Sequence, residues 1–266
     1  MIMNYIVITI DVEEDAPITG RPGYKGVVEG LPVILSLLRE HGYPCTMFVS
    51  CGVLNMIHRE SLNDRSIEIA SHGLYHTGPP HYLMGLSNER LFEQITLSKR
   101  ILEHKFKTQV LGFRAHGSLV DKRVISFICR CYKYDSSIVL FRKYEFGVRK
   151  NPEPYNIAKE LNLKGELMEI PRTALKIGIK HMPFVDGHMR RLPKILFFRP
   201  NFPLIVIDIH CQTLVKTSRS AISKITSILT GDFTKKLMDL LELYERAGFK
   251  FCLMRDIFYF FKNKIS

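Results

Sequence analysis

The chain has 266 residues, 46% of them hydrophobic and 24% charged, which is enough to bury a sizeable core in one large domain or two small ones. The apolar stretch 5–10 runs directly into acidic residues and is too short to cross a bilayer. No secretory signal is visible, so we expect a soluble, cytoplasmic protein. The net charge of +12 suits an anionic partner, but no nucleic-acid-binding signature accompanies it, so no nucleic acid is expected.

In the first half of the chain, predicted strands alternate with predicted helices. The strands are short apolar runs at 4–11, 45–50, 65–71 and 109–113. The first helix, 31–42, repeats its apolar residues at helical spacing and is stopped by Gly42. Ser87 is placed to cap a second helix at 88–103, and Asp121 to cap a third that runs through Phe127.

The second half continues the alternation with longer irregular segments. Further strands are predicted at 132–140, 165–173 and 203–210, then a helix at 233–248 and a closing strand at 249–254. Irregular structure is expected at 141–165 and 174–203. Such alternation implies βα units and a mainly parallel sheet. About seven or eight strands in a chain of this length favour a barrel-like closure, so the predicted fold class is α/β.

Two histidines stand four residues apart in the stretch EIASHGLYHTG, residues 68–78. Four residues make about one helical turn, so His72 and His76 can direct both imidazoles at one ion. With a carboxylate from elsewhere they would form a three-ligand metal site with an open position. Taken alone, the pair is more often explained as two surface histidines, so the rest of the chain must supply the third ligand.

Polar side chains follow nearly every predicted strand, at the positions where α/β barrels gather functional groups. Such a set suits metal-assisted hydrolysis, in which one carboxylate takes a proton from water and a histidine protonates the leaving group. Nitrogen and oxygen donors indicate Zn2+ first, although Co2+, Ni2+ and Mn2+ fit them too. The residues at these strand ends are Asp11, Glu13, Glu14, Asp15, His72, His76, Arg114, His116, Asp135 and His210.

The ordered series TIDVE, SHGLYH, GFRAHG, YDSSI and IDIH resembles the five motifs of the polysaccharide deacetylase superfamily, the NodB-homology or carbohydrate esterase family 4 enzymes. The helix at 88–103, the strand LMEIPRT and the closing strand FKFCLM also resemble segments of that family. VDGHMRRLPK is similar to a stretch seen in one of its branches. The resemblance covers nearly the whole chain, roughly 5–254, and implies a single catalytic domain over 1–266 with a distorted (β/α) barrel of about seven strands.

The resemblance also implies roles for individual residues. Asp11 matches the general base and His210 the general acid, while Arg114 matches the arginine that positions the base. Asp135 matches the acid that tunes the catalytic histidine. The metal ligands implied are Glu13, His72 and His76, and the substrate-binding residues predicted are His116, Gly117 and Arg190.

Three departures from the family pattern affect the expected site. Glu13 stands where relatives keep a metal-binding aspartate, and its neighbours Glu14 and Asp15 are rivals for that role. His116 replaces a proline of the third motif, where it can bind substrate, ligate the metal or fill space. The chain has no tryptophan, although many relatives line the acetyl pocket with one.

The function implied is removal of an N-acetyl group from an amino-sugar glycan or from a lipid- or nucleotide-linked precursor. A deformylase- or allantoinase-like hydrolase of another C–N bond and a catalytically silent carbohydrate-binding homologue are the alternatives. Basic and aromatic residues within 176–200 fit either a solvated face or a surface that meets anionic lipid at the inner face of a membrane. The metal, the sugar and the oligomeric state are not fixed by the sequence.

Overall fold

The computed structural model describes residues 4–15, 23–57, 62, 64–75, 82–178, 180–214 and 233–265. Nine strands of this part of the chain form one curled sheet in the order β12-β1-β2-β3-β4-β5-β9-β8, with β13 also paired to β1. All pairings are parallel except that of β8 with β9. The strands are β1 (Tyr5–Val12), β2 (Cys45–Val49), β3 (Ile67–Ser71), β4 (Gly112–Phe113), β5 (Tyr134–Asp135), β8 (Tyr155–Asn156), β9 (Met168–Glu169), β12 (Leu204–His210) and β13 (Lys250–Phe251).

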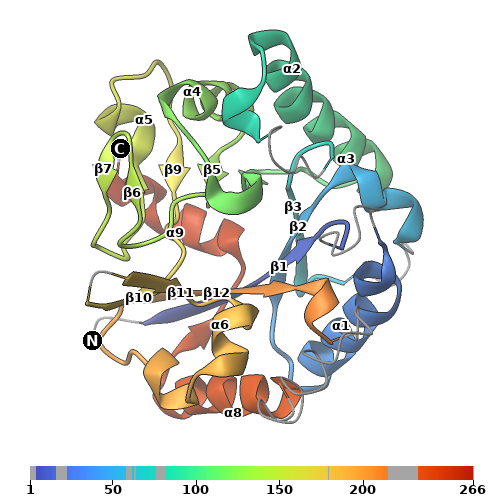
Figure 1. Cartoon of the computed structure of the whole chain (residues 1–266), viewed down its shortest axis with the longest axis vertical. Helices are drawn as coiled ribbons and strands as arrows, with labels where there is room; N and C mark the ends of the chain where they lie inside the picture. Colours follow the sequence, from blue (N-terminus) through green and yellow to red (C-terminus); the bar gives the residue numbers. More distant parts are fainter. Residues whose placement is uncertain are drawn as a thin grey trace.

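Helices surround the strands, so the predicted distorted (β/α) barrel is confirmed (Figure 1). Both predicted caps are present, since the side chains of Ser87 and Asp121 accept hydrogen bonds from the backbone N–H groups of Arg90 and Val124. The helices are α1 (Leu31–Glu40), α2 (Asn88–Phe92), α3 (Ser98–Phe106), α4 (Lys122–Cys131), α5 (Ile157–Glu160), α6 (Asp186–Arg191), α8 (Phe233–Arg246) and α9 (Met254–Ile265).

The two stretches expected to be irregular contain short regular elements. The first holds the hairpin of β6 (Lys143–Tyr144) with β7 (Gly147–Val148), and also β8 and α5. The second holds the hairpin of β10 (Ala174–Ile177) with β11 (Lys180–Pro183), followed by α6. Strands of two to four residues are too short to show a periodic pattern, which is why the sequence did not reveal them.

Side chains alternate between the two faces of each strand, and this alternation builds the site. On β1, Ile6, Ile8 and Ile10 pack outward in the large core cluster, whereas Tyr5 and Val7 belong to the inner cluster that α9 closes at the amino ends of the strands. The same inner face becomes polar toward the carboxyl ends of the strands, where it carries Thr9, Asp11 and Glu13.

Gly112 in β4 is required by this inner packing. A Cβ at this position would lie 2.0 Å from Cζ of Tyr134, whose ring covers the strand. The Tyr134 hydroxyl donates to the buried Glu68 carboxylate at 2.8 Å. The ring and the hydrogen bond together fill the middle of the inner face, below the polar residues.

Among the described helices, none is both long and apolar enough to span a membrane.

Candidate active site

Asp11 and His210 end two neighbouring strands and lie on the same face of the sheet. They are partners in the parallel register of β1 with β12. His210 Nε2 lies 3.9 Å from Asp11 Oδ2 and 3.9 Å from Glu13 Oε1, so the imidazole and the two carboxylates converge. The exposed fraction of the side chain is 26% for His210 and 4% for Asp11, so His210 is the more accessible to a substrate.

Arg114, directly after β4, links the ends of several strands from a fully buried position. Its Nη1 donates to Asp11 Oδ1 at 2.8 Å and to Asp208 Oδ1 at 2.9 Å. The same nitrogen reaches Thr9 Oγ1 at 2.9 Å, while Nε and Nη2 donate to Ser136. Charge-assisted hydrogen bonds of this kind are strong and directional, so the guanidinium fixes the orientation of the Asp11 carboxylate.

The acidic run after β1 offers three carboxylates to the histidines, and Glu13 is the one in contact. Glu13 Oε2 lies 3.3 Å from His72 Nε2. Asp15 instead accepts a hydrogen bond from the backbone N–H of Gly26 at 3.0 Å. Among the described contacts, Glu14 makes none with His72. The geometry therefore favours Glu13 over its two rivals as a ligand beside His72.

Nearby positive charge keeps the two site carboxyls ionised. Burial by itself raises the pKa of Asp11, but the Arg114 guanidinium and the neighbouring imidazoles outweigh it and hold that pKa well below its usual range. Burial likewise opposes ionisation of Glu13, whose hydrogen bond with His72 and the nearby positive charges lower its pKa to about 2. Both groups are carboxylates at neutral pH.

His210 is held as an imidazolium by a residue that the sequence reasoning missed. Its Nδ1 lies 2.8 Å from Asp186 Oδ1, at the start of α6. Burial lowers the pKa of His210, but the charge and hydrogen bond of Asp186, with help from Asp208 and Asp11, raise it well above the usual value. Asp186 lies within the family-like stretch VDGHMRRLPK, and an acid in that stretch is the signal that the sequence offers.

The structure does not bring Asp135 to His210, so the role predicted for Asp135 is corrected. Asp135 Oδ1 accepts a hydrogen bond from Ser137 Oγ at 2.7 Å, and its carboxyl neighbour is Glu169. The adjacent Tyr134 belongs to the inner cluster, so Asp135 points to the opposite face of β5. Asp186 occupies the place beside His210 that was assigned to Asp135.

The remaining predicted residues divide into three cases. His76 lies outside the described residues. His116 and Gly117 form a short 3-10 turn after β4, with the centroid of the His116 ring 4.0 Å from that of His72 and the two rings tilted by 40°. His116 is only 4% exposed, which leaves little surface for a glycan to contact. Arg190 lies on α6, one turn after Asp186, and is partly exposed.

The donor set suits a divalent cation. Ligand atoms of Glu13, His72 and His116 lie within 4.8 Å of one another. Burial lowers the pKa of His72, yet the carboxylates of Asp11 and Glu13 raise it, so positive charge is stabilised at this point. Imidazole nitrogen with carboxylate oxygen is a zinc-type donor combination that Co2+, Ni2+ and Mn2+ also accept.

Two further residues of the network were overlooked although their positions carried a signal. Asp208 stands two residues before His210 on β12, which puts both on one face of the strand. Arg172 follows β9 and donates from Nη1 to Asp208 Oδ2 at 2.5 Å. Asp208 therefore binds two guanidinium groups, and it shares Nη1 of Arg114 with Asp11.

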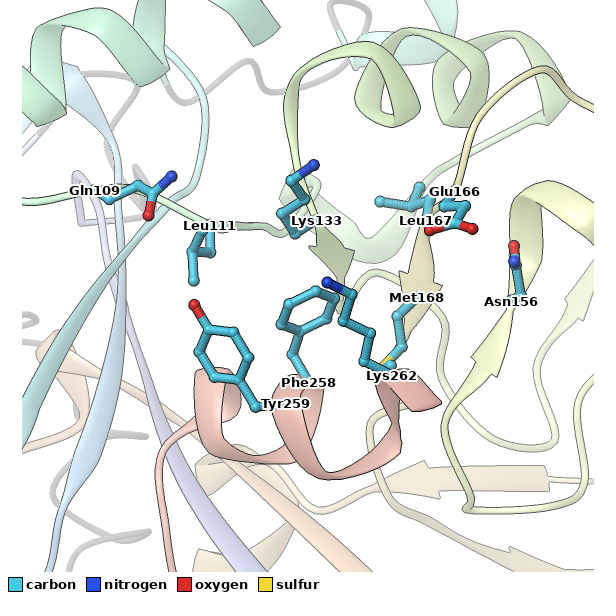
Figure 2. Close-up of a pocket in the computed structure, with 10 residues that line it drawn as sticks. All are labelled: Gln109, Leu111, Lys133, Asn156, Glu166, Leu167, Met168, Phe258, Tyr259 and Lys262. Atoms are coloured by element: carbon cyan, nitrogen blue, oxygen red, sulfur yellow. The ribbon is translucent and has the colours of Figure 1, made fainter. Parts of the chain in front are cut away.

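A separate pocket of about 210 Å³ lies at the amino ends of the strands, away from this site (Figure 2). The buried Phe258 of α9 and Met168 of β9 contribute to it, and the more exposed Lys133, Tyr259 and Lys262 also line it. It contains none of the predicted catalytic or metal-binding residues. The predicted residues lie instead at the opposite, carboxyl end of the sheet.

Fold and site together define a class of protein, a distorted (β/α) barrel in which a carboxylate and a histidine lie beside a group of residues that could hold a metal ion. The family model described as polysaccharide deacetylase matches residues 5–131. The motifs of the second half, including His210, fall outside that match. Over residues 5–131, a little under half of the chain, the sequence resembles the polysaccharide deacetylase superfamily, as the first three of its ordered motifs predicted.

Solved structures share the fold over nearly the whole chain. A Mycobacterium smegmatis protein described as a polysaccharide deacetylase has 18% identity, a TM-score of 0.66 and coverage of 99% of this chain and 92% of its own. An allantoinase has 14% identity, a TM-score of 0.65 and coverage of 97% and 90%. A peptidoglycan N-acetylglucosamine deacetylase has 13% identity, a TM-score of 0.55 and coverage of 99% and 90%. No curated protein matches the sequence.

Proposed function

We propose that the protein is a metal-dependent hydrolase that removes an N-acetyl group from an amino-sugar glycan or from a lipid- or nucleotide-linked precursor. The observation that carries the proposal is the pairing of an ionised Asp11 with a protonated His210 across 3.9 Å, beside Glu13 and His72. Amide hydrolysis needs a base and an acid in these two states, and a cation beside them.

In the proposed reaction the residues of the chain divide the proton transfers between them. Asp11, held by Arg114, accepts a proton from the attacking water. His210, held by Asp186, donates its Nε2 proton to the departing amine, so that an amide and water become acetate and an amino sugar. Glu13 and His72, with His76 of the sequence motif, are the proposed ligands of a divalent ion, with Zn2+ expected first. The ion supplies Lewis acidity, which polarises the carbonyl and lowers the pKa of water.

The assay that tests this function distinguishes it from its alternatives. The purified protein, loaded with Zn2+ or Co2+, is incubated with N-acetylated glycans, nucleotide-linked N-acetyl sugars, allantoin and formamides. Acetate release matched by new primary amine supports the deacetylase. Turnover confined to allantoin or to a formamide would favour another C–N hydrolase on this fold, as the allantoinase likeness allows. No turnover of any compound would favour a binding homologue.

A lipid-linked substrate is proposed from the surface near α6. Ile177 and Ile195 are 50% and 62% exposed, and Lys176 and Lys180 stand in the same basic stretch. Apolar side chains beside lysines fit an anionic membrane surface, where salt would screen the attraction. Sedimentation with acidic vesicles that decreases as salt rises would support this contact, and equal sedimentation with neutral vesicles would contradict it.

A further inference from the structure

His116, which stands where the family pattern has a proline, is buried against His72 rather than exposed to substrate. The exposed fractions of Glu13, His72 and His116 are 6%, 2% and 4%, so all three side chains lie inside the protein. Their ligand atoms lie within 4.8 Å of one another. We propose that His116 is a protein ligand of the divalent ion, alongside Glu13 and His72. This inference rests on the proposed function, because the ion is the one that the hydrolase requires.

The hydrogen bonds of the two histidines determine which nitrogen each offers to the ion. His72 Nδ1 lies 2.8 Å from the backbone carbonyl of Arg114, and a carbonyl only accepts, so Nδ1 carries the proton and Nε2 is the ligand atom. His116 Nε2 contacts the backbone carbonyl of His72 in the same way, which assigns the proton to Nε2 and leaves Nδ1 as its ligand atom. Metal-binding histidines typically donate their other N–H to such an acceptor.

The backbone holds His116 in this position. The turn after β4 places Gly117 at φ 61° and Ser118 at φ 58°, so the chain reverses immediately after the histidine. The side chain of Arg142 donates to the Gly117 carbonyl at 2.9 Å and secures the turn. A ligand held by a short turn loses little conformational freedom when the ion binds.

The other acidic group in the site is a poorer cation site. Ligand atoms of Asp11, Asp208 and His210 also lie within 4.8 Å of one another. However, Asp208 accepts from Arg114 with Oδ1 and from Arg172 with Oδ2, so both of its oxygens are bound to guanidinium groups. Two fixed positive charges next to that carboxylate repel an incoming cation, whereas no guanidinium among the described contacts binds Glu13.

The inference is tested by metal binding rather than by turnover. His116→Gln places an amide donor near the former Nε2, which keeps a hydrogen bond to the His72 carbonyl, and it removes the Nδ1 lone pair. Titration of the metal-free protein with Zn2+ should show at least about a 100-fold loss of affinity, the upper end of what even an indirect partner of a metal costs. His104→Ala, at an exposed histidine of α3, is the matched control and should bind Zn2+ as the wild type does.

A second measurement needs no substitution, so misfolding of a variant leaves the inference testable. In the wild type labelled with ¹⁵N-histidine, Zn2+ should shift the Nδ1 resonance of one imidazole, His116, and the Nε2 resonance of His72. Zn2+ binding in which every coordinated imidazole uses Nε2, or an unchanged affinity of His116→Gln, would overturn the inference alone. A wild type that binds no divalent ion would overturn the proposed metal-dependent function as well.

Discussion

Two groups of buried carboxyls lie near the carboxyl ends of the strands, and they differ in the side chains that face them. Asp11 and Asp208 are 3% and 2% exposed, and each accepts a hydrogen bond from Arg114. Asp135 and Glu169 are both fully buried and form a carboxyl pair on the other face of the sheet. Burial raises the pKa of Glu169 well above its usual range, and the adjacent Asp135 carboxylate raises it further.

The difference shows that counter-charge, rather than burial, decides whether a carboxyl remains ionised in this protein. Asp11 keeps its charge because the Arg114 guanidinium lies 2.8 Å away and lowers its pKa. In the second pair, Asp135 Oδ2 and Glu169 Oε2 receive no hydrogen bond from the described residues, and both pKa values are raised, so a proton shared between the two carboxyls would supply the missing donor. We therefore expect the first group to do chemistry and the second to hold the strands together.

The largest expected effect comes from the same substitution made in each group. Asp11→Asn removes the proposed base and should lower kcat/KM by a factor of about 10²–10⁴. Asp135→Asn keeps a hydrogen-bonding side chain in the carboxyl pair and should leave kcat/KM close to that of the wild type. The measurement is deacetylation kinetics on the substrate that the assay identifies.

Circular dichroism of both variants provides the control, because each should remain folded. Equal losses of kcat/KM in Asp11→Asn and Asp135→Asn would contradict the division between a chemical and a structural group. A loss confined to Asp135→Asn would reverse it.

How much the sequence could reveal follows from the same two groups. Ordered motifs and strand-end positions were sufficient to predict the barrel and to bring Asp11, Arg114 and His210 together, because parallel strands end at one edge of the sheet. Alternation along β5 could have excluded Asp135, since Tyr134 next to it is the apolar residue that packs inward. The contact of Asp186 with His210 was harder to predict, because Asp186 approaches from a short helix after a hairpin that shows no periodic pattern.

Breaking the counter-charge of the first group should have the largest effect on stability. Arg114→Met keeps a buried side chain of similar length but leaves Asp11 and Asp208 without their shared partner. Removing one member of a buried ion pair typically costs 3–5 kcal/mol, and we expect a loss of about that size in the free energy of unfolding. Urea denaturation measures it. Arg100→Met, at an exposed position of α3, is the control and should leave the free energy of unfolding close to that of the wild type. A loss in Arg114→Met no larger than that in Arg100→Met would contradict the stabilising role of the buried guanidinium.

A smaller effect is expected from the acid beside His210, the proposed general acid. Asp186→Asn removes the charge that, against burial, raises the pKa of His210, so that pKa should fall. Because the proposed general acid must be protonated, the alkaline limb of kcat/KM against pH should move to lower pH. Asp135→Asn should leave that limb in place. A shift in the Asp135 variant but not in the Asp186 variant would restore the assignment made from the sequence.

The smallest expected effect is a change in how stability depends on pH. Glu169 has a raised pKa in the folded protein, so above its ordinary value of 4.5 the unfolded chain releases this proton before the folded one does. The contribution of Glu169 to the free energy of unfolding is therefore complete below that pH and falls as pH rises toward the folded pKa. One proton corresponds to a slope of at most about 1–2 kcal/mol per pH unit.

Glu169→Gln should remove this fall, because an amide does not titrate and still donates a hydrogen bond to Asp135. Relative to the wild type, the variant should therefore gain stability between pH 5 and pH 8, measured by urea denaturation at each pH. The difference in the free energy of unfolding between variant and wild type is compared at pH 5 and pH 8. A loss from imperfect packing would be the same at both pH values, so it would not affect this comparison. A difference between variant and wild type that does not change with pH would mean that Glu169 is ionised, and that the second group is not a proton-sharing pair.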